Sequence, residues 1–204
     1  MPKRIAFITP AAPVLKREPP VGPQWIHEVK FDGWRMQLHK AGDRVVVFSR
    51  NGVDMTKRFA IVRDKVLSLP AASIIIDAEL VACDSDGQPD FNALMKGQRE
   101  NLCAWCFDLL ELDGRDTRSL PLVERKAALR DLLIAADGDA LRYSDEFDDP
   151  VKLLTVVTKM GLEGIVSKLG HQPYKSGKNV GRIKVKSQAW RETNRERWEM
   201  FQAK

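Results

Sequence analysis

The chain has 204 residues, 44% of them apolar and 30% charged, so it is long enough to bury one substantial core. No apolar run has the length that a membrane-spanning helix needs, and prolines interrupt the N-terminal stretch where a signal peptide would be apolar. Three cysteines, an odd number, argue against a disulfide framework and fit a reducing compartment. We therefore expect a cytoplasmic protein with no membrane association.

Positive charge is concentrated at the C-terminal end. The net charge is +5, but residues 165–204 carry ten Lys/Arg and three Asp/Glu and so contribute +7. A patch of this sign suits a polyanion such as a nucleic acid or a nucleotide phosphate, although a run of charge is also what a solvated face looks like. Charge alone leaves both interpretations open.

The first half of the chain indicates strands and one helix. After a proline-rich lead-in to about Pro23, "WIHEVKF" and "RMQLHKAGDRVVVFSRNG" predict three short strands joined by turns, which we interpret as an antiparallel meander. Apolar residues then recur at helical spacing from Thr56 until Pro70 ends the helix. "SIIIDAELVA" predicts a strong strand, closed by the turn "DSDG".

The second half alternates helices with strands. A short helix is expected near "FNALMKG", and the strand "LCAWCFDLLEL" follows, in which Cys103 and Cys106 face opposite sides and are interpreted as core residues rather than zinc ligands. Helices are predicted over 121–135 and 149–161, then strands at "LEGIVSK" and "RIKVK". The tail "AWRETNRERWEMFQAK" is expected to be helical, anchored by Trp190, Trp198 and Phe201.

This irregular order of elements predicts an α+β fold with antiparallel β-sheets flanked by helices, rather than a doubly wound sheet. We expect a proline-rich lead-in over 1–22 that packs on the domain, one domain over 23–188, and a helical tail over 189–204. In the last strand, alternation places Arg182, Lys184 and Lys186 on one face.

Lys30, in "EVKFDGWR", is a candidate nucleophile. A lysine is nucleophilic only as the free amine, so a site must desolvate it or place other cations nearby, and Arg35 and the cationic last strand are candidates for that role. The alternative is a strand lysine that extends its ammonium into solvent, because short motifs of this kind often occur by chance.

Six segments, taken in chain order, favour the interpretation of Lys30 as a nucleophile. "EVKFDGWR", "FSRNG", "DAELVA", "FDLLELDG", "EGIVSK" and "IKVK", with the loop "PYKSGKN", resemble the nucleotidyltransferase (adenylation) domain of ATP-dependent DNA ligases, within the covalent lysine nucleotidyltransferase superfamily. The similarity covers about residues 19–188 and is closest to bacterial ligases associated with end joining. It implies that family's ATP-grasp-like fold and the bacterial cytosol, and we expect no OB-fold domain in this chain.

The resemblance implies a role for each matched residue. Lys30 would attack the α-phosphate of ATP and hold AMP through a phosphoramidate. Glu28 would contact adenine, Phe107 would stack on it, and Glu79 would bind the ribose. Nucleotide and phosphate contacts would come from cationic residues of several motifs: Arg35, Arg50, Lys168, Lys184 and Lys186. Of these, Arg35, Arg50 and Lys186 would also bind DNA.

The same resemblance implies a divalent metal, Mg²⁺ or Mn²⁺, held by Glu79 and Glu163. Mg²⁺ keeps several waters and takes one or two carboxylates, which two glutamates from separate strands can supply. The implied substrates are ATP and the 5′-phosphate of a nick in double-stranded DNA, in DNA repair. A separate OB-fold or repair protein is an expected partner, since that barrel normally wraps the DNA and orients the pyrophosphate.

Several alternatives stay open at this level. Phe107 could be an ordinary core residue, Glu79 a partnered structural carboxylate, and "IKVK" an exposed amphipathic edge strand. The chain as a whole could instead be an RNA ligase or a capping-type nucleotidyltransferase, since the lysine chemistry is shared. It could also be a non-catalytic module that binds nucleotide or DNA.

Overall fold

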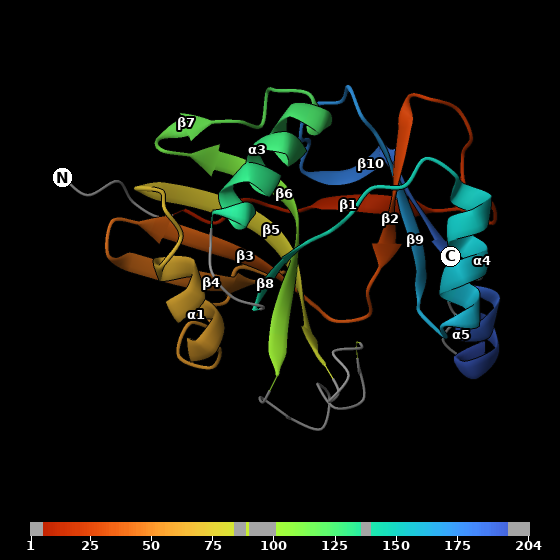
Figure 1. Cartoon of the computed structure of the whole chain (residues 1–204), viewed down its shortest axis with the longest axis horizontal. Helices are drawn as coiled ribbons and strands as arrows, with labels where there is room; N and C mark the ends of the chain where they lie inside the picture. Colours follow the sequence, from red (N-terminus) through yellow and green to blue (C-terminus); the bar gives the residue numbers. More distant parts are fainter. Residues whose placement is uncertain (1–5, 84–88, 90–100, 136–139, 196–204) are drawn as a thin grey trace. The chain divides into compact units, whose positions relative to one another are not determined.

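The computed structural model describes residues 6–83, 89, 101–135 and 140–195. Within it the chain forms two compact units whose segments interleave along the sequence. Unit 1 comprises Met1–Ala11, Asp32–Ser144 and His171–Gly177. Unit 2 comprises Ala12–Phe31, Asp145–Gly170 and Lys178–Lys204. Each unit is built around its own β-sheet (Figure 1).

Unit 1 contains a six-stranded sheet. Its path runs β4-β3-β5-β6-β7, and β8 pairs with β6 as the parallel exception among antiparallel neighbours. The strands are β3 (Trp34–Ala41), β4 (Arg44–Ser49), β5 (Ser73–Ala82), β6 (Leu102–Leu112), β7 (Arg115–Asp116) and β8 (Leu141–Tyr143). The apolar runs of β5 and β6 are explained by their central position, where both faces are covered.

Helices α1 (Ala60–Leu67) and α3 (Leu122–Ile134) pack on this sheet (Figure 1). The helical spacing seen in the sequence is the buried face of α1, because Val62 and Val66 are almost fully buried against β3 and β4. Leu129 of α3 belongs to the same apolar cluster, so sheet and helices share one core.

Unit 2 contains a four-stranded sheet in the order β1-β10-β9-β2. The strands are β1 (Ala11–Leu15), β2 (Trp25–Lys30), β9 (Gly164–Leu169) and β10 (Gly177–Lys186). Helix α4 (Pro150–Lys159) packs on β9 and β2, and α5 (Gln188–Thr193) contacts α4 (Figure 1). The side chain of Asp149 accepts from the backbone N–H groups of Val151 and Lys152, the helix start that an Asp-Pro pair predicts.

The predicted α+β class with antiparallel sheets is confirmed, but the N-terminal meander is wrong. β3 and β4 form a hairpin as expected, whereas β2 pairs with β9 instead of β3. The Asp32-Gly33 link is therefore no hairpin turn. A Cβ at Gly33 would lie 2.3 Å from the carbonyl oxygen of Leu80, so glycine is needed for close passage beside β5 rather than for a tight reversal.

The last strand also differs from the expectation. β10 begins at Gly177, five residues before Arg182, and lies between β1 and β9, so the edge-strand alternative for "IKVK" is wrong. Both thiols of "CAWC" are buried, and the contact of Cys103 is with Cys83, Sγ to Sγ 3.1 Å. The expected helix near "FNALMKG", together with Trp198 and Phe201, lies outside the described residues. Within the described part, helices are too short or too polar to cross a membrane.

Candidate functional site

Lys30 is the last residue of β2 and lies opposite Gly164 of β9. Its Nζ forms an ion pair with Glu163 Oε2 at 2.7 Å, and its side chain is 21% exposed whereas that of Glu163 is 4% exposed. The lysine is therefore held by a buried carboxylate at the end of a strand. It is not a cation that simply extends into solvent.

Gly164 brings the strands that carry this lysine close together. Its φ is +151°, a region that side chains disfavour, and an added Cβ would lie 2.0 Å from the carbonyl oxygen of Val185 in β10. It is opposite Lys30 on one side and Lys186 on the other. The glycine of "EGIVSK" thus lets the ends of β2 and β10 flank β9 without an intervening side chain.

Glu163, which precedes that glycine, joins the two lysines. Oε1 pairs with Nζ of Lys186 while Oε2 pairs with Lys30. Lys186 and Glu163 are each 5% exposed and Lys30 is half-buried, so this is a triad of one negative and two positive groups with two of its members buried. Removing one partner from a buried pair leaves a charge without compensation, so the three groups constrain one another.

A second buried pair lies on the same strands. Lys168 Nζ donates to Glu28 Oε1 at 2.6 Å, and both residues are almost fully buried. Glu28 and Lys30 are two residues apart in β2, so their side chains project from the same face of the sheet. Lys184 of β10 is half-buried and lies opposite Val166 of β9.

The predicted site residues of unit 2 therefore gather across β2, β9 and β10. This group is Glu28, Lys30, Glu163, Lys168, Lys184 and Lys186. The remaining predicted residues belong to unit 1: Arg35, Arg50, Glu79 and Phe107.

Arg35 in β3 is held by a buried polar network. Its Nη2 donates to Asp77 Oδ2 at 2.9 Å, and its Nη1 donates to the carbonyl oxygen of Ala11. Burial by itself would lower the pKa of Arg35, but the Asp77 carboxylate, with smaller contributions from Tyr174 and Glu79, outweighs burial and raises it. The guanidinium is therefore a permanent cation with a fixed direction.

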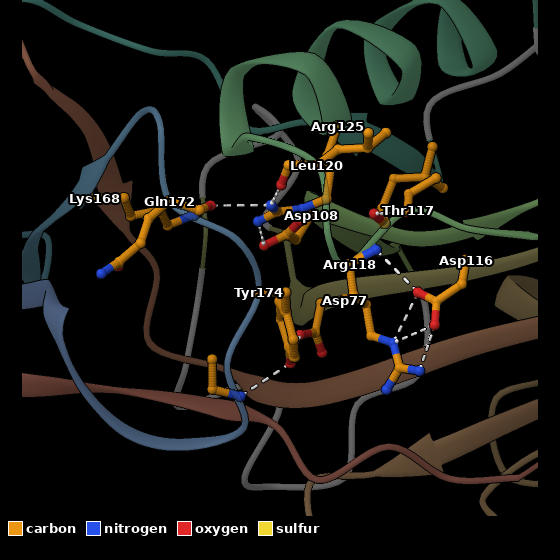
Figure 2. A network of polar contacts seen from close by, with 12 residues as sticks. Asp77, Asp108, Asp116, Thr117, Arg118, Leu120, Arg125, Lys168, Gln172 and Tyr174 are labelled. Atoms are coloured by element: carbon orange, nitrogen blue, oxygen red, sulfur yellow. Dashed lines mark hydrogen bonds and ion pairs between the residues drawn. The ribbon is translucent and has the colours of Figure 1, made fainter.

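Tyr174, from the loop "PYKSGKN", completes that network. Its hydroxyl donates to Asp77 Oδ2 at 2.6 Å and accepts from the backbone N–H of Ala11 at 2.9 Å, and Figure 2 shows the tyrosine beside Asp77. Burial, followed by the nearby carboxylate, raises the pKa of Tyr174, so the hydroxyl keeps its proton for this donation. Asp77 consequently accepts from both an arginine and a tyrosine.

A fully buried ion pair anchors the loop that carries Tyr174. Arg125 of α3 donates through Nε and Nη2 to the two oxygens of Asp108, at 2.7 and 3.1 Å. Its Nη1 donates to the carbonyl oxygens of Leu120 and Gln172, so one guanidinium joins β6, α3 and the loop (Figure 2). This bidentate geometry suits arginine, whose planar fork matches a carboxylate.

The other predicted residues of unit 1 lie at different depths. Phe107 is half-buried, and the Arg35 guanidinium lies 5.4 Å from its ring centroid, so the ring contacts a cation. Glu79 is half-buried in β5 opposite Arg35 and Trp105. Arg50 is exposed in the turn after β4.

Sequence reasoning missed three residues that hold these side chains: Asp77, Tyr174 and Gly164. For Asp77 a signal existed, since a carboxylate within "SIIIDAELVA" requires a buried partner. Nothing in the sequence pairs Tyr174 with it, because 97 positions separate the two residues. The role of Gly164 depends on β10, which is paired with β9 only in the folded sheet.

The carboxylate at this site fits a metal ion that takes most of its ligands from water and phosphate. In the described residues, no group of three or more His, Cys, Asp or Glu side chains gathers as a metal site. Glu163 nevertheless supplies a buried carboxylate of the hard-oxygen type that Mg²⁺ uses, and Mg²⁺ takes its remaining ligands from water and phosphates.

A lysine amine flanked by a shared carboxylate and a second ammonium, at the ends of cation-bearing strands, is suited to attack on a phosphate group. The cations can neutralise charge on the phosphate oxygens, and the amine can form a covalent bond to phosphorus. Together with the two largely antiparallel sheets, this arrangement is typical of a nucleotidyltransferase.

The chain belongs to the ATP-dependent DNA ligase domain family, whose model matches residues 14–186. The Pseudomonas aeruginosa protein described as multifunctional non-homologous end joining protein LigD is 36% identical over 187 residues, which is 89% of this chain and 22% of that protein. A probable DNA ligase of Mycobacterium sp. strain KMS is 32% identical over 170 residues, covering 79% of this chain and 33% of the relative.

Solved structures agree. A mycobacterial DNA ligase D complexed with ATP and MES matches with a TM-score of 0.77 at 25% identity, covering 87% of this chain and 60% of that one. The resemblance to end-joining ligases and the nucleotidyltransferase fold are thus confirmed. The chain spans between a fifth and a third of the length of these two curated relatives, at 22% and 33%.

Proposed function

We propose that this chain is the adenylation domain of an ATP-dependent DNA ligase and that Lys30 is its nucleophile. The observation that supports this most directly is the Lys30–Glu163–Lys186 triad, in which Lys30 Nζ lies 2.7 Å from a shared, buried carboxylate. Before the attack, the Lys30 ammonium gives a proton to solvent water, which its partly exposed side chain can reach, and Nζ leaves Glu163. The N–P bond to the α-phosphorus of ATP then forms as the P–O bond to pyrophosphate breaks.

The surrounding residues position ATP and compensate its charge. Lys186 remains beside the reacting phosphate as a cation, and Lys168 and Lys184 contact phosphate oxygens. Glu28 contacts adenine, Phe107 stacks on it, and Glu79 binds the ribose, as the resemblance implies. Bound Mg²⁺, held by Glu163 and Glu79, would supply further neutralisation of phosphate charge.

The second step transfers AMP from Lys30 to the 5′-phosphate of nicked double-stranded DNA. Arg35 and Arg50 bind that phosphate, and Arg35 is suited to it because Asp77 and Ala11 already fix its guanidinium. The phosphodiester forms when the 3′-hydroxyl displaces AMP. We propose DNA repair in the bacterial cytoplasm as the setting, with a separate OB-fold or repair protein as partner.

Covalent labelling tests the first step. The chain is incubated with α-³²P-labelled ATP and Mg²⁺, then analysed on a denaturing gel beside Lys30→Ala and the matched control Lys152→Ala, whose side chain is 85% exposed in the same unit. We expect the label on wild type and Lys152→Ala and none on Lys30→Ala. A folded wild type without label, or a label that survives Lys30→Ala, contradicts the proposal.

Nicked substrates then distinguish DNA ligase from RNA ligase. Labelled protein is mixed with a nicked DNA duplex or a nicked RNA duplex of the same sequence, each with a 5′-phosphate at the nick. We expect the label to move to the DNA strand at least ten times faster. Preferred transfer to RNA favours the RNA ligase alternative, and transfer to neither favours a domain that needs its partner for the second step.

A further inference from the structure

Helix α5 begins directly after the strand that ends in Lys186. Ser187 caps it by accepting from the Trp190 N–H at 3.2 Å, and the same hydroxyl donates to the carbonyl oxygen of Leu162 at 2.6 Å. The backbone N–H of Ser187 donates to the carbonyl oxygen of Glu163 at 2.9 Å. One fully buried serine thus ties the start of α5 to the backbone of the shared carboxylate.

Trp190 places its ring against the ammonium of Lys186. Nζ lies 3.8 Å from the ring centroid, close enough for a strong cation–π contact, and Trp190 is 6% exposed. Arg191 donates through Nε and Nη2 to the carbonyl oxygen of Lys186, at 3.0 and 2.7 Å. The helix therefore holds both the backbone and the charged end of this lysine.

The contact of Lys186 Nζ with Trp190 differs chemically from its ion pair with Glu163. Glu163 holds the ammonium with a negative charge that cancels part of its field, whereas an aromatic face attracts the cation without carrying a net charge. An indole face also has no lone pair suited to take the proton. The contact with Trp190 therefore adds no negative charge to offset the field of Lys186 at a phosphate.

Packing accounts for part of this position, because Trp190 is the buried residue of α5, which contacts α4. The apolar cluster of unit 2, as far as the chain is described, consists of buried side chains of α4, β9 and β10 and does not include Trp190: Leu153, Val157, Ile165 and Val185. The Trp190 ring also lies against a charged atom, the Lys186 Nζ.

We infer that Trp190 is a positioning residue for Lys186 in adenylyl transfer, a role that rests on the proposed function. It keeps the ammonium directed to the end of β2, where Lys30 lies, when Glu163 exchanges its lysine partners for other groups. The residue acts through Lys186 and does not touch the nucleotide itself.

Graded fluorination of the indole tests this without changing its shape. Trp190 is replaced by monofluoro-, difluoro- and trifluorotryptophan through site-specific incorporation, since fluorine progressively weakens the negative face of the ring. The single-turnover rate of Lys30 labelling is measured against ATP concentration. We expect the maximal rate to fall stepwise, about tenfold by the trifluoro ring, with little change in the ATP concentration at half-saturation.

Conventional variants test whether the effect of Trp190 on the labelling rate depends on Lys186. Trp190→Phe should retain more of the rate than Trp190→Leu, and in a Lys186→Met background the two should differ by less than twofold. Gln188→Ala, at an exposed position of the same helix, serves as the control. Urea unfolding is measured for every variant, and a Trp190→Leu protein that fails to fold leaves the fluorination series decisive.

The outcomes distinguish a failure of the role of Trp190 from a failure of the proposed function. A flat fluorination series on a wild type that labels normally overturns the role of Trp190 and leaves the proposed function intact. Equal losses for Trp190→Leu in both backgrounds also overturn it, because they indicate general packing. A wild type that does not label at all overturns the proposed function, and the inference with it.

Discussion

In the ion pairs described for buried carboxylates, the cations of unit 1 are arginines, whereas those of unit 2 are lysines. Among the described residues of unit 1, Arg35 pairs with Asp77 and Arg125 with Asp108. In unit 2 the carboxylates of Glu28 and Glu163 pair with lysines. An arginine fork fixes direction through several donors, while a lysine is a point charge on a flexible stem that can change partner.

The difference matters for the proposed chemistry. A nucleophile has to exchange a carboxylate for a phosphate, so its contacts must be replaceable, and Lys30 meets that requirement through its ion pair with Glu163. A residue that recognises a phosphate in a fixed place benefits from rigidity, which Arg35 obtains from Asp77 and Ala11. Variants at Asp108 and His39 test whether unit 1 is the fixed part, and glycine variants test the close strand approach in unit 2.

The largest expected effect is at Asp108, because it and Arg125 are fully buried. Asp108→Asn leaves the arginine without its counter-charge and should cost about 4 kcal/mol of unfolding free energy. Asp116→Asn is the matched control, since its pair with Arg118 is exposed and worth about 0–1 kcal/mol. Urea denaturation followed by circular dichroism gives both values. Equal losses would mean that the buried pair is not what fixes unit 1.

Acid should destabilise unit 1 through His39. Burial lowers its pKa to about 4, although Asp77 opposes the shift, so the folded protein keeps it neutral while the unfolded chain takes up a proton below its ordinary pKa of 6.5. This stability is present above pH 6.5 and is lost as the pH falls towards 4, about 3 kcal/mol in all.

His39→Gln removes the titration and should flatten the dependence of unfolding free energy on pH over this range. His171→Gln, at an exposed histidine of the same unit, is the control. Burial also lowers the pKa of His27, against opposing effects of Asp148 and Asp149, so unit 2 has an acid-sensitive group of the same sign. An unchanged pH slope in His39→Gln would disprove the assignment.

The smallest expected difference compares two glycines of unit 2. Gly161 has φ +69° with open space around its Cα, so Gly161→Ala costs only the strain of the left-handed region, about 1 kcal/mol. Gly164→Ala adds a collision with the Val185 carbonyl oxygen and should cost at least about 1 kcal/mol more. Urea denaturation of both variants measures the difference. Similar losses would show that β9 and β10 can separate without penalty.

Local patterns predicted most of the elements. Helical spacing from Phe59 to Leu69 became α1, the Asp149-Pro150 pair became the start of α4, and the apolar run at 73–82 became β5. These features are set by residues near one another in sequence, so they could be recognised without a partner. The same holds for Lys30 as a candidate, because its motif is continuous.

Pairings between distant segments could not be predicted in this way. Lys30 and Glu163 are 133 positions apart, and they meet because β2 pairs with β9 rather than β3. An Asp-Gly link permits either a hairpin or a departure into another sheet, and the sequence carries no local signal that distinguishes them. The meander expected here was wrong for that reason.

By itself, the sequence determined the α+β class, the candidate nucleophile and the residue types around it, because periodicity and continuous motifs are local properties. Only the tertiary structure decided that Glu163 is shared by Lys30 and Lys186, that Tyr174 supports Arg35 through Asp77, and that Trp190 covers an ammonium. Buried charges require partners, but which distant segment supplies each partner depends on strand order and close backbone approach.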